Sequence, residues 1–269
     1  MTSRRQEIMK ELGLWPVWRL REPVAADAAE VTLLDSVGAS PVINPLADEL
    51  PVPQSPARGV AGGAPALPLD ARAAAIAQMD WPQLKESVAG CIACPLHKGR
   101  NKTVFGVGDE HAEWLFVGEG PGADEDAKGE PFVGQAGKLL DNMLAAISLK
   151  RGRNVYIANI VKCRPPGNRN PEPSEAGRCE PYLHRQIALI KPRLIIALGK
   201  VAAVNLLRRD ASIASLRGKV LEYQNIPLII TYHPAYLLRS LPDKAKAWED
   251  LCFAVETMKA LQSTKPIPI

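Results

Sequence analysis

Residues 114–126 read Trp-Leu-Phe-Val-Gly-Glu-Gly-Pro-Gly-Ala-Asp-Glu-Asp, and residues 131–134 read Pro-Phe-Val-Gly. The first four residues form an apolar run that is typical of a buried strand. A glycine-rich turn with several carboxylates follows the run, and an aromatic side chain stands between Pro and Gly shortly afterwards. Ligand pockets of α/β sheets lie where strands end. The stretch therefore predicts a small-ligand pocket that contains carboxylates and one aromatic ring.

Three more apolar runs lie downstream, at residues 155–161, 194–198 and 228–232. Apolar residues recur at helical spacing in residues 139–147, 201–207 and 248–258. Strands that alternate with helices favour a mostly parallel sheet that is covered on both faces. We therefore expect an α/β protein with three α/β/α layers and a mostly parallel, four-stranded central sheet.

The residues that follow each apolar run should meet at the carboxyl edge of this sheet, where open α/β sheets bind their ligands. Besides Glu119, this edge would receive Asn159, Lys162 and His233. A single histidine usually has a structural role. His233, however, directly ends an apolar run and precedes Pro234, a residue that is typical of a helix start. We therefore predict that His233 is functional.

Four of the five cysteines form a two-plus-two set, with Cys91 and Cys94 in a C-x-x-C pair and Cys163 and Cys179 far downstream. Such a set predicts one metal centre. Prolines close after Cys94, Cys163 and Cys179 favour iron–sulfur ligation, although thiolates alone also allow a four-cysteine zinc site. Either centre would fasten an N-terminal loop to the sheet. Cys252 lies in the apolar pattern of the last helix and is expected to be a small buried residue.

Length and composition fit one ordinary α/β core with a tail. The chain has 269 residues, of which 46% are hydrophobic, and a formal net charge of +4. This charge favours a polyanionic partner only weakly. We find neither a secretory signal nor an apolar run long enough to span a membrane. We therefore expect a cytoplasmic protein without a membrane partner, whose thiols are reduced or bound to metal.

The chain divides into three parts. Residues 1–22 predict a short helix, which either presents Trp15 and Trp18 to a partner protein or rests on its own domain. Residues 23–69 are rich in Pro and Ala and cannot bury enough apolar surface to offset their ordering entropy, so we expect a flexible, disordered linker. The compact domain is expected to span residues 70–264.

Basic residues cluster beside these features. The clusters are Lys98, Arg100 and Lys102 after the C-x-x-C pair, Lys162, Arg164 and Arg169 around Cys163, and Arg239 after His233. Each cluster alone is typical of a solvated surface. Together they border the expected pocket, which favours a track for a phosphate backbone around a site that accepts one extruded base.

Several separated motifs occur in an order that resembles the family 4 uracil-DNA glycosylases. They are Gly-Glu-Gly-Pro-Gly at residues 118–122 with Glu125 and Asp126, Pro-Phe-Val-Gly at 131–134, Asn-Ile-Val-Lys-Cys-Arg-Pro-Pro-Gly-Asn-Arg at 159–169, His-Pro-Ala-Tyr-Leu-Leu-Arg at 233–239, and the four cysteines. The resemblance covers residues 88–261. It implies a DNA-repair enzyme that removes uracil from single- or double-stranded DNA, with a 4Fe-4S cluster on Cys91, Cys94, Cys163 and Cys179.

The resemblance also implies roles for the pocket residues. Phe132 would stack on the flipped uracil, and Gly120 would contact it. Asn159 would read the uracil edge, because an amide offers a donor for O4 and an acceptor for N3–H. His233 would donate a hydrogen bond to O2 as negative charge develops on the departing base. The DNA backbone would be contacted by Lys162, Arg164, Arg169 and Arg239.

A carboxylate near the sugar would stabilise the cationic transition state and orient the attacking water. Glu119 and Glu125 both fit; we slightly prefer Glu125 for this role, with Glu119 shaping the loop or holding the water. Asp124 and Asp126 are expected to be helix caps or solvated. No lysine nucleophile is implied, and the sequence lacks the Arg-Arg-Ile-His stretch of a related group that traps itself on DNA. Both features favour a monofunctional glycosylase that leaves an abasic site.

We expect a monomer in the bacterial cytoplasm, because the enzyme must slide along DNA, and the N-terminal helix would suit recruitment to a repair or replication protein. Two other classes remain open. A non-catalytic iron–sulfur module would recognise deaminated bases in nucleic acid with the same aromatic ring and basic rim, without releasing a base. An iron–sulfur redox protein would leave the acidic glycine turn and His233 without a role.

Overall fold

The computed structural model describes residues 69–263. The helix expected at residues 1–22 and nearly all of the expected linker lie outside this range. Helix α2 (Leu69–Ala77) is the first element of the described range. No helix among residues 69–263 has the length and apolar character needed to cross a membrane.

The four predicted strands form the parallel centre of the sheet. They are β2 (Trp114–Gly118), β3 (Val155–Asn159), β4 (Leu194–Leu198) and β6 (Ile226–Thr231). The sheet has six strands rather than four, in the order β1-β3-β2-β4-β6-β5. The edge strands β1 (Val107–Gly108) and β5 (Leu221–Tyr223) pair antiparallel with their neighbours. Both escaped prediction because strands of two and three residues carry too little alternation to be recognised.

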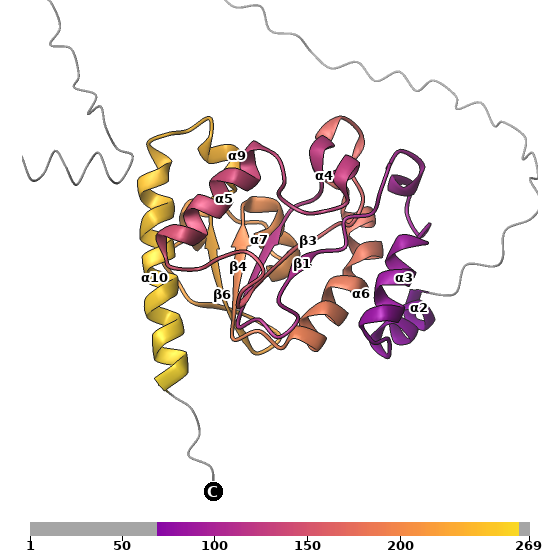
Figure 1. Cartoon of the computed structure of the whole chain (residues 1–269), viewed down its shortest axis with the longest axis horizontal. Coiled ribbons are helices and arrows are strands. Elements are labelled where there is room, and N and C mark those ends of the chain that lie inside the picture. Colours follow the sequence, from indigo (N-terminus) through magenta and orange to yellow (C-terminus); the bar gives the residue numbers. More distant parts are fainter. Residues whose placement is uncertain (1–68, 264–269) are drawn as a thin grey trace, which may run out of the picture. The chain divides into compact units, whose positions relative to one another are not determined.

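Consecutive residues of the parallel strands point to opposite faces of the sheet and enter two separate cores. Leu115 and Val117 join the core that is shared with α2, α3 (Trp81–Ala89), α6 (Pro173–Ile190), α7 (Lys200–Leu207) and α8 (Ile213–Leu216). Trp114 and Phe116 join the core that is shared with α5 (Gln135–Ala146) and α10 (Asp243–Ser263). Figure 1 shows α10 and α5 on one side of the sheet and α6, α3 and α2 on the other. The predicted three-layer α/β/α architecture is confirmed.

The predicted helical patterns correspond to α5, α7 and α10, whereas α6 was not predicted. Helix α6 contains Gly177 and Pro181, which disfavour a helix when the sequence is considered alone. It nevertheless runs for 18 residues, since Tyr182, Leu183 and Ile187 are buried against the sheet. Tertiary packing therefore overrides local preference in this helix, which carries Cys179.

Short elements complete the carboxyl edge of the sheet. They are α4 (Ala123–Lys128) after β2, the 3-10 helices at Pro95–Lys98 and Pro166–Asn168, and α9 (Pro234–Leu237) after β6. Leu237 of α9 packs with Met143 of α5 and Leu251 of α10. This small cluster fixes the start of α9, and therefore the position of His233.

Candidate functional site

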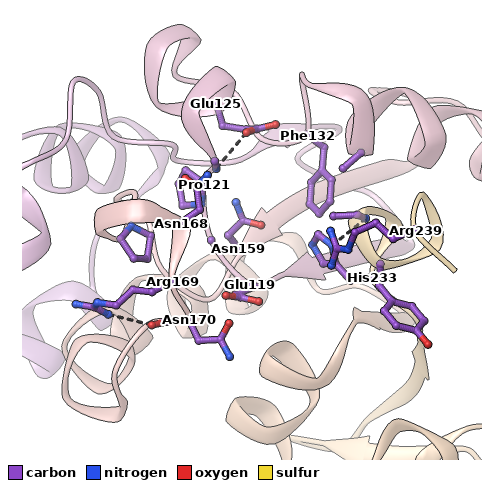
Figure 2. A pocket seen from close by; sticks show the side chains of 16 residues that line it. Glu119, Pro121, Glu125, Phe132, Asn159, Asn168, Arg169, Asn170, His233 and Arg239 are labelled. Atoms are coloured by element: carbon purple, nitrogen blue, oxygen red, sulfur yellow. Dashed lines mark hydrogen bonds between the residues drawn. The ribbon is translucent and has the colours of Figure 1, made fainter.

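A pocket of about 470 Å3 opens at the carboxyl ends of β2, β3 and β6. Its volume suits a small organic ligand. Its lining residues are Glu119, Gly120, Pro121, Gly122, Glu125, Phe132, Ala136, Asn159, Pro165, Asn168, Arg169, Asn170, His233, Ala235, Tyr236 and Arg239. Figure 2 shows Phe132, Asn159, Glu119 and His233 gathered around the cavity. All six residues predicted for catalysis or substrate binding therefore line one pocket.

Asn159 is the last residue of β3, where it pairs with Gly118 of β2. The side chain is 2% exposed, and its Oδ1 has no hydrogen-bond partner among residues 69–263. A Cβ on Gly118 would lie 2.5 Å from this Oδ1 and 2.6 Å from the Phe132 ring. Gly118 is therefore required by close packing of these two side chains. An unpaired buried carbonyl oxygen is costly, so the Asn159 amide is poised to receive a ligand.

The Phe132 ring is held by an unusual backbone. Phe132 has a φ of 54°, a conformation that is rare for a bulky residue and that clusters at functional sites. Arg151 holds this segment, because its Nη1 and Nη2 each donate to a carbonyl, of Pro131 and of Phe132 respectively, at 2.8 Å. A Cβ on Gly137 would collide with the Phe132 carbonyl. Sequence reasoning missed Arg151, since nothing local links it to residues 131 and 132.

His233 is the N-cap of α9, and its Nδ1 accepts a hydrogen bond from the Ala235 amide at 3.2 Å. Burial, with a smaller contribution from the positive charge of Arg239, lowers the pKa of His233 from 6.5 to about 4. The imidazole is therefore neutral near pH 7. Because Nδ1 is the acceptor, the single ring proton resides on Nε2, which leaves Nε2–H free to donate to a ligand.

The two glutamates have different surroundings. The Glu125 carboxylate accepts hydrogen bonds from the amides of Gly122, Val133 and Gly134 at 2.9 to 3.2 Å. It therefore fastens the glycine turn to the segment that carries Phe132. The Glu119 carboxylate has no protein donor among residues 69–263, and burial raises its pKa above 4.5. Of the two acids, Glu119 is the one free to act on a ligand or water.

Asp126 differs from its predicted role as a helix cap or solvated acid. The side chain is fully buried. Its carboxylate accepts hydrogen bonds from the Asn101 amide and from Asn101 Nδ2, the latter at 2.6 Å. Asp126 therefore holds the loop that follows the C-x-x-C pair against α4. The sequence could not show this contact, because the two residues lie on separate elements.

Two of the four basic residues predicted for the DNA backbone line the pocket. Arg169 and Arg239 lie on opposite sides of the pocket in Figure 2. Arg169 forms two hydrogen bonds of 2.8 Å with the buried carboxylate of Glu175, which orient its guanidinium. Arg164 is partly exposed, donates to Asn168 Oδ1 at 2.7 Å and does not line the pocket. The cavity thus has a basic rim made of side chains from two separate loops.

Lys162 contradicts the prediction that it contacts DNA. The residue is 1% exposed, and burial lowers the pKa of its ammonium to about 8. Its Nζ donates to the Asn159 carbonyl at 3.0 Å and to Gln186 Oε1 at 2.6 Å. A backbone phosphate cannot reach an ammonium enclosed in this way. The side chain turns inward because α6, which was not predicted, supplies an internal acceptor.

The four cysteines of the two-plus-two set line one small cavity, together with Arg100. They come from the loop after α3, the segment after β3, and α6. Three of the thiols accept hydrogen bonds: Cys91 from Arg72 at 3.7 Å, Cys163 from Arg100 at 3.1 Å, and Cys179 from the Lys162 amide at 3.3 Å. Such donors stabilise sulfur that carries negative charge.

These thiols are free rather than disulfide-bonded. Burial raises the pKa of Cys163 above 9.0 and that of Cys179 to about 12, so a bound metal would be needed to deprotonate them. Among residues 69–263, no group of three or more Cys, His, Asp or Glu can hold a single metal ion. Cys252 is partly exposed, contrary to the expectation that it is buried.

Known proteins match this chain over its compact domain. The model of the uracil DNA glycosylase superfamily matches residues 105–252. The type-4 uracil-DNA glycosylase of Archaeoglobus fulgidus is 49% identical over 159 residues, or 56% of this chain and 79% of that protein. The type-4 enzyme of Pyrobaculum aerophilum is 43% identical over 181 residues, or 64% of this chain and 92% of that protein.

A third relative, the type-4 uracil-DNA glycosylase of Thermotoga maritima, is 44% identical over 159 residues, or 58% of this chain and 82% of that protein. A type-5 uracil-DNA glycosylase of Pyrobaculum aerophilum is more distant, at 31% identity over 146 residues. The type-4 relatives are thus both more similar and more fully covered. This chain belongs to the uracil-DNA glycosylase superfamily and, within it, to the type-4 uracil-DNA glycosylases.

Proposed function

We propose that this protein is a DNA-repair glycosylase, which flips uracil out of DNA and hydrolyses its N-glycosidic bond. The observation that carries the proposal is the set of side chains that line one pocket, in a chain of the type-4 family. The pocket combines an aromatic ring, an unpaired amide, a neutral imidazole and a free carboxylate. These groups match the stacking, edge recognition, charge stabilisation and water activation that the reaction needs.

Recognition of the base falls to Phe132 and Asn159. The flat Phe132 ring offsets part of the stacking that uracil loses when it leaves the helix. The Asn159 amide offers a donor to O4 and an acceptor to N3–H. Cytosine presents the opposite pattern at these two positions, so it would leave the buried amide mismatched. A site of this kind rejects the wrong base mainly through the cost of unpaired polar groups.

His233 would stabilise the departing base. When the glycosidic bond breaks, negative charge develops on the uracil ring and is shared by O2. A donor that is already in place stabilises that charge without reorganisation. The Nε2–H of a neutral His233 is such a donor, since its Nδ1 is engaged with the Ala235 amide. His233 can therefore act without first binding a proton.

Glu119 would orient the water that attacks the sugar. An ionised carboxylate stabilises the oxocarbenium-like transition state and orients the water that attacks it. The sequence alone led us to prefer Glu125 slightly for this role. Its three backbone hydrogen bonds instead favour a positioning role, and the carboxylate free of protein donors belongs to Glu119. We therefore assign to Glu119 the role of orienting the attacking water.

The product would be an abasic site in an uncut strand. A glycosylase that also nicks DNA uses an amine as its nucleophile. None of the described residues that line the pocket is a lysine, and Lys162 is enclosed behind Asn159. Arg169 and Arg239 would hold the phosphates on either side of the flipped nucleotide. The substrate is DNA that contains uracil, in single or double strands.

The four-cysteine centre would hold a 4Fe-4S cluster. The cluster is favoured over zinc by the prolines close after Cys94, Cys163 and Cys179, and all four cysteines line one cavity. Cys91, Cys94, Cys163 and Cys179 would bind the irons. The cluster would supply cross-linking, because its ligands join the loop after α3, the end of β3 and α6.

The proposal is tested with the purified holoprotein and a uracil-containing oligonucleotide. We expect release of free uracil and an abasic strand that breaks only after treatment with alkali. Binding of this DNA without base release would instead support the non-catalytic module. Iron, sulfide and zinc are measured on the same sample. About four irons and four sulfides per chain are expected, and a colourless protein loaded with zinc would contradict the cluster.

A further inference from the structure

Lys162 stands behind the base-reading residue rather than in front of the DNA. Its side chain leaves the segment after β3, turns back and donates from Nζ to the backbone carbonyl of Asn159 at 3.0 Å. The side chain is 1% exposed. A buried ammonium is retained only where its hydrogen bonds are satisfied. Here it spans the turn that separates the predicted reading residue from the cysteine centre.

The second contact of Lys162 anchors it to α6. Gln186 Oε1 accepts from Nζ at 2.6 Å, and Gln186 Nε2 donates to the Phe105 carbonyl at 2.9 Å. Gln186 is itself fully buried. The amide orientation is therefore fixed at both ends, and it determines where the Lys162 ammonium lies. A fixed donor at the Asn159 carbonyl in turn limits rotation of the Asn159 backbone.

The backbone of Lys162 faces the other way. Its amide donates to Cys179 Sγ at 3.3 Å, and the next residue is Cys163. One residue thus contacts both the strand end that carries Asn159 and the thiols of the metal centre. The Asn159 backbone is thus held by Lys162, whereas the Oδ1 atom of its side chain remains unpaired. No hydrogen bond within the described residues restrains that oxygen.

We propose that Lys162 is a positioning residue for uracil recognition: its ammonium holds the Asn159 backbone so that the amide meets the uracil edge, and its amide links that geometry to the cysteine centre. The inference rests on the proposed function. It assigns to the lysine no contact with DNA and no step in the chemistry. Removal of the Lys162 ammonium should therefore weaken binding of the base without weakening binding of DNA.

The test uses Lys162→Met, which keeps an unbranched side chain only one atom shorter but removes the donor. Two affinities are measured in the holoprotein: inhibition by free uracil, and binding of DNA that carries an abasic-site analogue without a base. We expect the inhibition constant of uracil to rise about tenfold or more, which corresponds to the loss of one or two buried hydrogen bonds. Affinity for abasic DNA should remain within about twofold, because no phosphate contact is removed.

The control is Tyr156→Phe, at the far end of the same network. The Tyr156 hydroxyl accepts a hydrogen bond from Gln186 Nε2 at 3.5 Å, and within residues 69–263 it forms no hydrogen bond with Asn159. This variant removes one long hydrogen bond from the same buried network and leaves the Lys162 and Asn159 side chains in place, so it reports any general loosening of that network. We expect its uracil inhibition constant and its iron content to equal those of the wild type.

A second variant guards against misfolding of Lys162→Met. The double variant Lys162→Met/Gln186→Leu removes the buried ammonium together with its side-chain acceptor, so neither side chain is left unpaired by the loss of the other. It should fold, retain its iron and show the same loss of uracil affinity. Equal uracil affinity in a folded variant would overturn the inference. Weaker binding to abasic DNA with a shallower salt dependence would also overturn it, in favour of a phosphate contact.

Failure of this inference can be distinguished from failure of the proposed function. If the wild type neither releases uracil nor is inhibited by it, the function itself is wrong. If the wild type excises uracil and the variants bind uracil as tightly as it does, only the role of Lys162 is wrong. If the variants lose uracil affinity only in proportion to lost iron, the lysine acts through the centre alone and the inference fails.

Discussion

The Phe132 and His233 rings lie against each other in the pocket, with centroids 5.5 Å apart and planes inclined by 32°. A base sandwiched between two rings would need about 7 Å, two contacts of roughly 3.5 Å each. The two side chains therefore cannot both stack on the same base. One must present its face and the other must meet the edge of the base. Since the Nε2–H of His233 is free to donate, His233 addresses the edge and Phe132 the face.

Replacing His233 should slow the reaction without weakening the binding of DNA. The His233→Ala variant loses a donor that acts mainly in the transition state, so we expect the single-turnover rate to fall by about 10² to 10³. DNA affinity should change by less than about threefold, because ground-state contacts are largely preserved. Quenched-flow or manual single-turnover assays measure the rate. His111→Ala, at an exposed histidine outside the pocket, should retain the wild-type rate.

Substitution of each glutamate by glutamine should distinguish the roles of Glu119 and Glu125. Glu119→Gln removes the free carboxylate and should lower the rate by about 10² or more with little change in thermal stability. Glu125→Gln removes a charged acceptor of three amides and should lower the midpoint of thermal unfolding, with a smaller effect on rate. Equal rate losses in two variants of unchanged stability would contradict this division.

The pH dependence should carry the signature of Glu119. Burial raises its pKa above 4.5, and activity requires the ionised form, so the single-turnover rate should fall as pH drops through that raised value. His233, with a pKa of about 4, remains neutral over most of this range and should not set the limb. Glu119→Gln should therefore flatten the acid limb of a rate profile. A limb that persists unchanged in Glu119→Gln would assign it to another group.

Discrimination between bases should depend on the Asn159 amide. Asn159→Asp replaces the N–H donor with a carboxylate oxygen, which repels O4 of uracil and accepts from the exocyclic amine of cytosine. We expect excision of uracil to fall by about a hundredfold, and the ratio of uracil to cytosine excision to narrow. Both rates are measured on otherwise identical oligonucleotides. An unchanged ratio would remove Asn159 from base recognition.

Retention of the proposed iron–sulfur cluster should depend on Arg100. Its Nη1 donates to Cys163 Sγ at 3.1 Å and to the Cys91 carbonyl at 2.7 Å, so it restrains two ligand segments and stabilises charged sulfur. In Arg100→Met we expect iron to be lost at least about threefold faster in the presence of a chelator, as is typical for loss of a hydrogen bond to a metal ligand. Visible absorbance follows the loss. Lys98→Met, at an exposed neighbour, is the matched control and should match the wild type.

From the sequence alone, the parallel centre of the sheet and the membership of the pocket could be predicted. Apolar runs such as residues 194–198 correspond to β4 residue for residue, because a strand buried on both faces must be continuously apolar. In a parallel sheet the residues after each strand meet at one edge. The sequence therefore predicts that Glu119, Asn159 and His233 are neighbours.

Tertiary structure decided what those neighbours do. Glu119 and Glu125 are equivalent in the sequence, and only the fold of the loop gives Glu125 three amides and leaves Glu119 without a donor. Lys162 belongs to a basic cluster in the sequence, yet α6 turns it inward by offering Gln186. Hydrogen-bond partners and burial depend on residues distant in the chain. Residue type and spacing therefore identify the pocket, while long-range packing assigns each side chain its task.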